Sequence, residues 1–227
     1  MVRFHRRFDP HSIQLVIFDL DGTLIDSRLD LIHSVNATLR HLSRPALPGD
    51  VVASYVGDGA PMLIRRALGD PKDEKMIKNA LEFFLAHYKE HKLDHTTVYA
   101  GIPEALRQIH SNGTRRQMVV LSNKPVNPSR AIVEALGLAH FFTHVYGGNS
   151  FDTKKPDPLG IRTILKGTGV SAGNALMVGD SSVDVLTGRN AGLATCGVTY
   201  GFAPLTFKEV QPDVVVDTPQ ELRELFQ

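Results

Sequence analysis

Two aspartates, Asp19 and Asp21, stand two residues apart directly after the apolar run at residues 15–18. Alternate side chains of a strand share one face, so both carboxylates can point into the same crevice where the chain leaves a sheet. Such a pair is costly unless a cation neutralises it or one member keeps its proton. The pair therefore indicates one of two kinds of chemistry: a site for a hard metal ion, or a nucleophile beside an acid.

Two later segments carry groups that suit phosphate. Ser122 and Asn123 close an apolar run, and a small hydroxyl with neighbouring backbone N–H groups can hold phosphate oxygens. The same pair is common in ordinary turns and helix caps. Lys155 stands before Pro156, which restricts its backbone and presents a fixed positive charge. The alternative is a surface lysine that precedes a helix.

A second pair of aspartates, Asp180 and Asp184, follows another apolar run and begins the next helical pattern. Carboxylates in that arrangement suit a hard cation with oxygen ligands. The alternative is that Asp180 caps the helix while Asp184 complements its dipole. The cation site is favoured because this pair occurs together with Asp19 and Asp21.

The elements that must position these loops alternate along the second half of the chain. The predicted strands are continuous apolar runs, typical of strands buried on both faces, and cover residues 15–18, 118–121, 144–146, 175–178, 194–198 and 214–216. Helical patterns lie between them, at residues 103–112 (ended by Gly113), 129–136, 158–166 and 183–190. This alternation predicts an α/β fold with a doubly wound, Rossmann-like parallel sheet. Ligands bind at the carboxyl ends of such strands, so the polar loops should converge there.

Residues 28–96 break the alternation and are predicted as helices only, over residues 29–42, 51–56, 61–68 and 73–92. An aromatic cluster in the last of these is interpreted as core packing and consists of Phe83, Phe84 and Tyr88. We therefore expect an all-helical cap domain (28–96) inserted into an α/β core (13–27 and 97–227). A basic, solvated tail of residues 1–12 would precede the core.

Composition narrows the classes of function. The chain has 227 residues, 42% of them hydrophobic, and a net charge of +1, so nothing global attracts nucleic acid or a membrane surface. Its apolar runs are shorter than the roughly 18 residues of a membrane span. The single cysteine, Cys196, is expected as a buried thiol in a reducing, cytoplasmic setting.

The ordered motifs resemble those of the haloacid dehalogenase superfamily of phosphatases. They are Asp19-Leu20-Asp21-Gly22-Thr23, Ser122, Lys155-Pro156 and Gly179-Asp180-Ser181-Ser182-Val183-Asp184. The helical insertion is similar to that superfamily's helical cap class. Within the superfamily, the chain looks most like the phosphoglycolate phosphatases, on the strength of Gly57-Asp58-Gly59, Arg66-Ala67-Leu68 and Val198-Thr199-Tyr200-Gly201-Phe202.

The resemblance implies a mechanism. Asp19 would be the nucleophile, forming an aspartyl-phosphate, and Asp21 the general acid and then the general base. Mg²⁺ would be held by the Asp19 and Asp180 carboxylates and the Asp21 backbone carbonyl, with Asp184 binding it directly or through water.

The same resemblance assigns supporting roles. Ser122, Lys155 and the backbone amides near Asn123 and in the first loop would hold the phosphoryl oxygens. Thr23 would order the first loop, and Ser181 would support the second acidic pair.

The implied substrate is a small phosphorylated metabolite, handled by a monomer or a homodimer. A two-carbon substrate with a carboxylate calls for a cation in the cap, for which Arg65 and Arg66 are the candidates. Their alternative interpretation is a solvated helix face.

Other functions stay open. They include a phosphatase for a sugar phosphate, a nucleotide or pyrophosphate, a β-phosphoglucomutase, and a non-catalytic binding protein. A phosphonate hydrolase would need a Schiff-base lysine in the cap, where Lys72, Lys75 and Lys78 suggest a solvated face instead.

Overall fold

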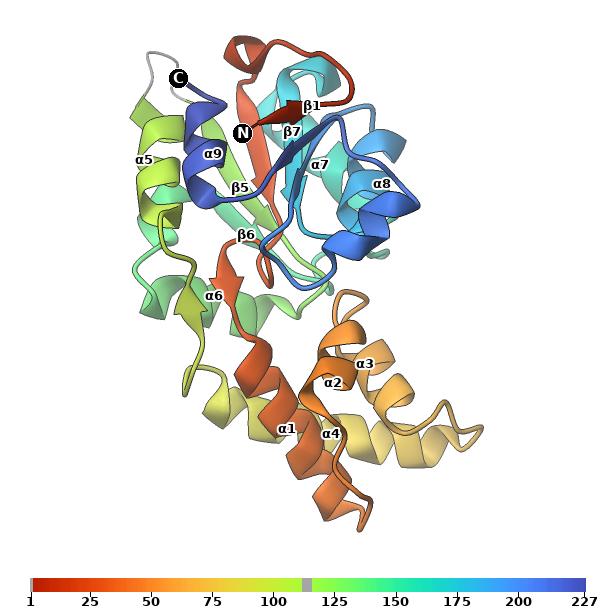
Figure 1. Cartoon of the computed structure of the whole chain (residues 1–227). Coiled ribbons are helices and arrows are strands. Elements are labelled where there is room, and N and C mark those ends of the chain that lie inside the picture. Colours follow the sequence, from red (N-terminus) through yellow and green to blue (C-terminus); the bar gives the residue numbers. More distant parts are fainter. Residues whose placement is uncertain (1, 112–115) are drawn as a thin grey trace.

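The computed structural model describes residues 2–111 and 116–227. Its larger part is a seven-stranded sheet of order β1-β9-β8-β7-β2-β5-β6 with helices on both sides (Figure 1). The strands are β1 Arg3–Phe4, β2 Leu15–Phe18, β5 Gln117–Leu121, β6 His144–Tyr146, β7 Ala175–Gly179, β8 Ala194–Val198 and β9 Val214–Val216. All neighbouring pairs are parallel except β1 with β9. The predicted α/β fold with a parallel sheet is confirmed.

Alternation along the central strands divides the core into two apolar layers. Val16 and Phe18 of β2 belong to one cluster and Leu15 and Ile17 to the other. The first layer contains side chains of α5 Ile102–Ser111, α6 Val126–Ala135 and α9 Pro219–Glu224. The second contains side chains of α7 Leu159–Thr168, and α8 Ser182–Asn190 packs beside it through Gly188. Burial on both faces explains why the strands are continuous apolar runs.

The register of the central strands brings the polar loops together. Phe18, the last residue of β2, pairs with Val120 of β5 on one side and with Val178 of β7 on the other. Asp19 therefore leaves the sheet between the loops that follow β5 and β7. These loops carry Ser122 and Asp180.

Four helices form a second unit below the sheet (Figure 1): α1 Arg28–His41, α2 Gly49–Ser54, α3 Ala60–Ala67 and α4 Glu74–His91. Their buried side chains make a separate apolar cluster that includes Val35, Ile64 and Phe84. A short antiparallel pair, β3 Ile25–Asp26 and β4 Thr97–Val98, joins this unit to the sheet. The separate clusters support the proposed division into core and cap.

The structure adds elements that the sequence patterns did not predict. They are β1, β3, β4, α9 and the short 3₁₀ helices η1 Pro10–Ser12, η2 Ala139–Phe141, η3 Ala172–Asn174 and η4 Pro204–Lys208. These elements are too short to show a period. Helix α6 begins three residues before its predicted start, at Val126 rather than Ser129. The predicted end of α5, at Asn112 and Gly113, lies outside the described residues.

The basic N-terminal segment differs in part from the expected solvated tail. Arg3, His5, Arg6 and Arg7 are exposed, as expected. The backbone of β1, however, pairs with β9, and Arg3 bonds to Asp217. This pairing depends on contacts more than 200 residues apart, which no local pattern reveals.

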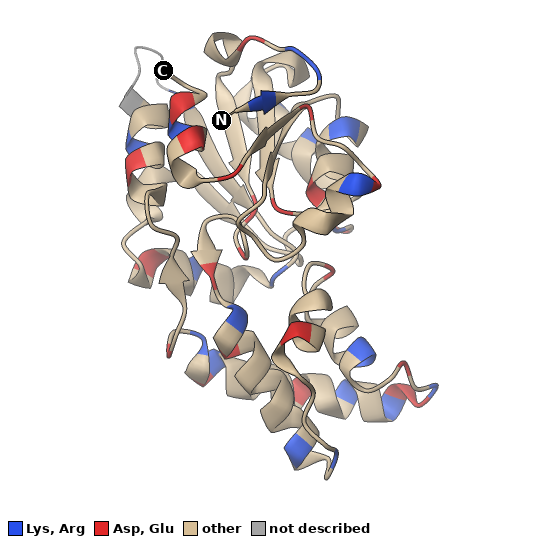
Figure 2. Cartoon of the chain, in the orientation of Figure 1, with Lys and Arg blue, Asp and Glu red and all other residues tan. Residues whose placement is uncertain are grey.

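Surface features agree with the near-neutral composition. Basic and acidic residues are interspersed over both units (Figure 2). None of the helices in the described part of the chain has the length and apolar character of a membrane span. The predicted buried thiol is confirmed: Cys196 lies in the core, where burial raises its pKa to about 12.

Candidate active site

The first motif forms a tight loop at the end of β2. The Asp19 amide donates to the Val178 carbonyl at 2.9 Å, which extends the parallel pairing by one residue. Gly22 has a φ of +84°, and a Cβ there would lie 2.2 Å from Asp180 Oδ2. Only glycine allows this approach. The loop thus brings the first acidic pair against the second.

Three buried carboxylates gather around one ammonium group. The Asp19, Asp180 and Asp184 oxygens lie within 4.8 Å of one another. Lys155 Nζ lies 2.7 Å from Asp19 Oδ1 and 2.6 Å from Asp184 Oδ1. Three carboxylates thus face a single buried cation, which leaves an excess of negative charge.

Burial and the neighbouring negative charges both raise the pKa values of the Asp19 and Asp180 carboxyl groups. Burial raises the pKa of Asp19 to about 6 despite the attraction of Lys155, and the Asp184 charge adds to this rise. Burial and the charges of Asp184 and Asp19 raise the pKa of Asp180 well above its usual value. A hard divalent cation with oxygen ligands fits this cluster.

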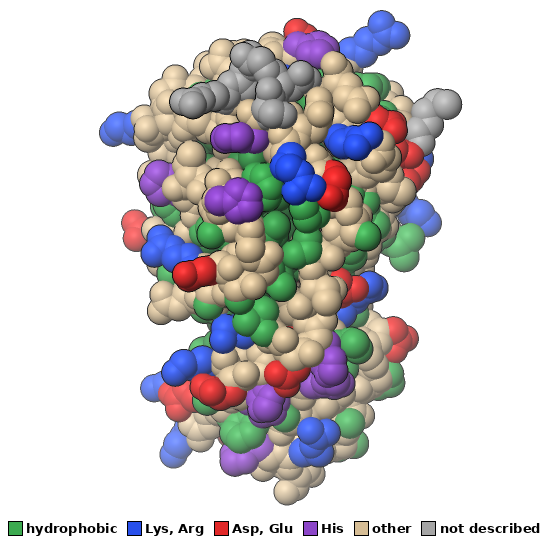
Figure 3. Space-filling model, turned by 90° about the vertical axis from the view of Figure 1, so that its left-hand side faces the viewer, with side chains coloured by type: hydrophobic (Ala, Val, Ile, Leu, Met, Phe, Trp, Pro, Cys, Tyr) green, Lys and Arg blue, Asp and Glu red, His purple; other side chains and the backbone are tan. Residues whose placement is uncertain are grey.

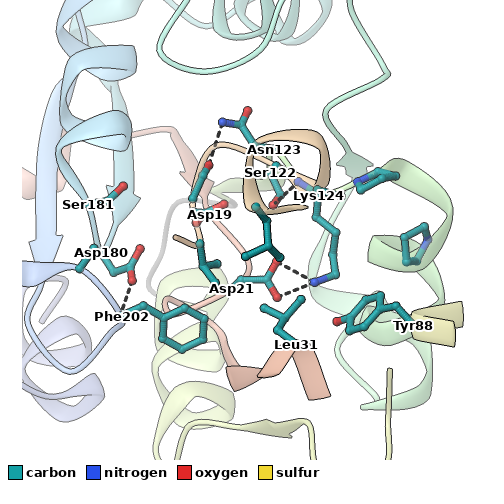
Figure 4. A pocket seen from close by; sticks show the side chains of 18 of the residues that line it. Asp19, Asp21, Leu31, Tyr88, Ser122, Asn123, Lys124, Asp180, Ser181 and Phe202 are labelled. Atoms are coloured by element: carbon teal, nitrogen blue, oxygen red, sulfur yellow. Dashed lines mark hydrogen bonds and ion pairs between the residues drawn. The ribbon is translucent and has the colours of Figure 1, made fainter. Parts of the chain in front are cut away.

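The two later aspartates have different surroundings. Asp184 Oδ2 accepts from the Ser181 amide at 3.2 Å and from its hydroxyl at 2.8 Å, in a capping box at the start of α8. Asp180 does not cap the helix, contrary to the alternative drawn from the sequence. Its Oδ2 accepts from the Phe202 amide at 2.5 Å (Figure 4). Among described residues, no hydrogen bond is made to Asp180 Oδ1 or Asp19 Oδ2, so these oxygens suit a metal best.

Asp21 lines the same pocket as Asp19 but is held by different partners. Lys124 Nζ contacts its two carboxylate oxygens at 2.7 and 2.9 Å (Figure 4), and the Ser27 hydroxyl donates to Oδ1. Sequence analysis gave Lys124 no role. Its signal was its position, directly after Ser122 and Asn123 in the loop that follows β5.

The loop after β5 supplies a buried hydroxyl, from Ser122, and an amide side chain, from Asn123, that links two other loops. Ser122 is buried in the pocket wall, and its Oγ accepts from the Lys124 amide at 3.2 Å. The Asn123 side chain donates to the carbonyls of Gly57 and Lys155 at 3.0 and 3.1 Å and accepts from the Lys155 amide at 3.0 Å. The Asn123 side chain is therefore engaged in holding the Lys155 loop and the cap loop together.

A pocket opens between this edge of the sheet and the cap. Its core wall includes Asp19, Asp21, Ser122 and Asp180 (Figure 4). Its cap wall is mostly apolar and consists of Leu31, Val56, Gly57, Gly59, Ala60, Leu63, Phe84, Leu85 and Tyr88. Phe84 and Tyr88 belong to the cap core, as expected, and also face the pocket. Phe83 does not: it is half-buried and stacks on His41.

The two cap arginines lie elsewhere. Arg65 bonds to both carboxylate oxygens of Glu74 at 2.7 and 2.8 Å. Arg66 bonds to Asp58 at 2.5 Å and to the Tyr55 carbonyl at 3.2 Å. Neither guanidinium lines the pocket, contrary to the expectation that one of them meets the substrate.

Thr23 lies inside the first loop. Its side chain is fully buried, and Oγ1 has no hydrogen-bond partner in the described part of the protein. Its carbonyl accepts from the Tyr200 hydroxyl at 3.1 Å. This contact links the first loop to the loop after β8, in keeping with the expectation that Thr23 orders the loop.

Comparisons with known proteins agree with this geometry. A family model described as haloacid dehalogenase-like hydrolase matches residues 16–198. A phosphoglycolate phosphatase of Pseudomonas savastanoi pv. phaseolicola is 36% identical over 98% of this chain and 83% of its own length. One of Vibrio parahaemolyticus is 37% identical, over 94% of this chain and 96% of its own.

The fold has counterparts among solved structures. The crystal structure of a predicted phosphoglycolate phosphatase from Haemophilus somnus 129PT has a TM-score of 0.88 and 28% sequence identity, and the match covers 95% of this chain and 99% of that one. The family match spans strands β2, β5, β6, β7 and β8 of the sheet, the cap and all four motifs. The chain is therefore an enzyme of the haloacid dehalogenase-like hydrolase family.

Proposed function

We propose that this enzyme hydrolyses 2-phosphoglycolate with the help of Mg²⁺. The observation that carries the proposal is one pocket in which Asp19, Asp21 and Ser122 meet, with the Lys155 ammonium 2.7 Å from Asp19. Nucleophile, acid and phosphate ligands for a phosphomonoester are thereby within reach of one another.

Side chains of this protein account for both steps of the proposed hydrolysis. An Asp19 carboxylate oxygen attacks phosphorus and forms an aspartyl-phosphate, while Asp21 protonates the departing alkoxide. Asp21 then takes a proton from the water that hydrolyses this intermediate. Lys155 and the Ser122 hydroxyl bind the phosphoryl oxygens, on which transition-state charge spreads.

Mg²⁺ would be held by the Asp19 and Asp180 carboxylates and the Asp21 carbonyl, with Asp184 contacting it directly or through a water molecule. When bound, it neutralises charge so that an anionic nucleophile can approach an anionic phosphate. The fit rests on three buried carboxylates that lie close together, only two of which are paired with Lys155.

The choice of substrate rests on the named relatives and on the pocket. The relatives at 36–37% identity are phosphoglycolate phosphatases. The largely apolar cap wall offers few partners for the hydroxyls of a sugar or a ribose, which suits a small substrate.

A phosphatase for another small ester, or a mutase that returns the phosphoryl group to a sugar, is the second candidate. A Schiff-base reaction is disfavoured because Lys72, Lys75 and Lys78 are all exposed on the cap surface. The buried free Cys196 supports a cytoplasmic location. The protein would act on its substrate as a monomer or a homodimer.

Phosphate release from a panel of small esters, with Mg²⁺ and with EDTA, tests the proposal. Phosphoglycolate should give the highest kcat/KM, and EDTA should abolish release. Asp19→Asn should lower kcat about a thousandfold or more while the protein stays folded. Equal rates on sugar phosphates and nucleotides would refute the substrate, and full activity of Asp19→Asn would refute the mechanism.

A further inference from the structure

Lys124 is a buried cation for which the reaction described above has no role. Its residue is 8% exposed, and its ammonium group reaches both oxygens of Asp21. An ammonium group paired at this distance with a carboxylate places a positive charge in the pocket wall.

Tyr88 places a second polar group beside this charge from the cap side. Lys124 Nζ lies 4.8 Å from the centre of the Tyr88 ring (Figure 4). The Tyr88 residue is 4% exposed, and its hydroxyl lies beside the Lys124 ammonium but makes no hydrogen bond of ordinary geometry with any described residue. A buried hydroxyl without a partner is costly, which indicates a group that a ligand completes.

The dimensions of the proposed substrate direct its carboxylate to this place. Asp21, as the general acid, must lie within hydrogen-bond distance of the ester oxygen. In phosphoglycolate one methylene separates that oxygen from the carboxylate, so the two lie roughly 3 Å apart. The substrate carboxylate must therefore lie beside Asp21, where Lys124 Nζ already lies 2.7 Å from Asp21 Oδ1.

The other cationic side chains near the site are less suitable partners for the substrate carboxylate. Lys124 is the one lysine or arginine among the described residues that line the pocket. Arg65 and Arg66 are held by cap acids, and Lys155 is held between Asp19 and Asp184, where it is assigned to the phosphoryl group.

From these contacts we infer that Lys124 and the Tyr88 hydroxyl form the subsite for the substrate carboxylate, with Lys124 exchanging its Asp21 partner for the substrate. The inference rests on the proposed function and deepens it, because it makes a core lysine and a cap tyrosine the residues that select a carboxylate-bearing ester. The subsite draws on both units, so it is complete only when the cap covers the core.

A pair of substrates isolates the subsite. Ethyl phosphate carries a methyl group where phosphoglycolate carries its carboxylate, so the ratio of their kcat/KM values reports on carboxylate recognition alone. In Lys124→Met this ratio should fall about 10- to 100-fold, as for the loss of a charged hydrogen bond. In Tyr88→Phe it should fall about 3- to 10-fold.

Lys78→Met is the matched control, because it removes an exposed charge from the helix that carries Tyr88. Its ratio should equal that of the wild type. Circular dichroism would check that each variant is folded. Tyr88→Phe keeps the ring stacked on Phe84, at 5.7 Å between centroids, so it carries the test if Lys124→Met does not fold.

The outcomes separate the two proposals. A wild type that strongly prefers phosphoglycolate, with an unchanged ratio in Lys124→Met and Tyr88→Phe, overturns the subsite and leaves the proposed function intact. A wild type that does not prefer phosphoglycolate to ethyl phosphate overturns both. A ratio that falls in both variants and not in Lys78→Met supports the subsite.

Discussion

At the scale of single residues, the site is built from charges that the protein holds away from water. Asp19, Asp180 and Lys155 are all buried, and each is positioned by residues distant in sequence. Taking such charges out of water is costly unless each finds a partner. The lysine meets part of this requirement, and a bound divalent cation would meet the rest.

The acidic cluster should therefore make stability depend on pH and metal together. Burial raises the pKa of Asp19 from 3.8 to about 6, so the folded protein resists its ionisation. Protonated Asp19 therefore contributes to the free energy of unfolding. This contribution is fully present below about pH 4 and is lost as the pH rises through about 6, a change on the order of 3 kcal/mol. Mg²⁺ binds the ionised form. It should raise Tm by several degrees more at pH 7.5 than at pH 5.

Thermal melts with Mg²⁺ or EDTA at the two pH values measure this difference. Asp180→Asn is the informative variant, since it removes one of the repelling charges. It should melt higher than the wild type in EDTA at pH 7.5 and gain little from Mg²⁺. An equal rise in Tm on adding Mg²⁺ at both pH values would contradict the proposed link between Asp19 ionisation and metal binding.

At the scale of elements, the carboxylate of Asp30 binds the segment that leaves the cap to the first cap helix. Asp30, in the first turn of α1, is 1% exposed and accepts from the His95 and Thr96 amides at 2.9 and 2.8 Å. It also accepts from the Thr96 hydroxyl at 2.7 Å. These bonds lie just before β4, where the chain leaves the cap. They fix the geometry of the connection between cap and core.

Two histidines, His33 and His95, lie beside this connection. Figure 3 shows histidine side chains on both the core half and the cap half of one face. His33 and His95 lie close enough to Asp30 for the three to hold a metal ion. The Asp30 oxygens already accept four hydrogen-bond contacts, so its role in the connection explains the carboxylate without a metal.

Replacing Asp30 should weaken the connection. Asp30→Ala would leave the His95 amide and the buried Thr96 amide without an acceptor. It should lower the free energy of unfolding by about 2–4 kcal/mol. Hydrogen exchange of the His95 and Thr96 amides should accelerate. Urea denaturation measures the first effect and exchange the second.

Thr96→Val is the control, because it removes only the hydroxyl contact. It should lower the free energy of unfolding by about 1 kcal/mol and leave the His95 and Thr96 amides protected from hydrogen exchange. If Asp30→Ala unfolded at the same urea concentration as the wild type, the fastening role would be wrong.

At the scale of the whole molecule, the N-terminal segment closes one edge of the sheet. The His5 and Arg6 amides bond to the Asp213 carbonyl at 2.8 and 3.0 Å. Arg3 pairs with Asp217 and is the main cause that lowers the pKa of this carboxyl to about 2. Figure 1 places β1 at the end of the sheet away from the cap, so the segment contributes to stability rather than to the site.

Deletion of residues 1–7 should therefore separate stability from activity. Losing the β1 pairing should lower the free energy of unfolding by about 1–2 kcal/mol, which corresponds to a few degrees of Tm. The phosphatase kcat/KM should stay unchanged. Arg3→Ala should cost less than about 1 kcal/mol because both partners are largely exposed. Thermal melts and ester hydrolysis measure the two effects. A large loss of activity in the folded deletion variant would contradict this assignment.

The sequence by itself determined the parts of this protein that depend on local order. Strand-length apolar runs and helical periods predicted the sheet and the cap helices, because burial on two faces or on one stripe leaves a regular trace. The family motifs named Asp19, Asp21, Lys155 and Asp180, since reactive groups placed at strand ends must converge at one edge of the sheet.

Only the tertiary structure decided which charges meet. Asp21 and Lys124 are 103 residues apart, and Asp19 and Lys155 are 136 apart, so neither pair follows from local spacing. The cap arginines were plausible partners for a carboxylate until their own acidic partners, Glu74 and Asp58, were seen. Tyr88 belongs to the helical period of the cap core and equally lines the pocket. A side chain's partner is set by the packing of whole elements, and a one-dimensional pattern does not record that packing.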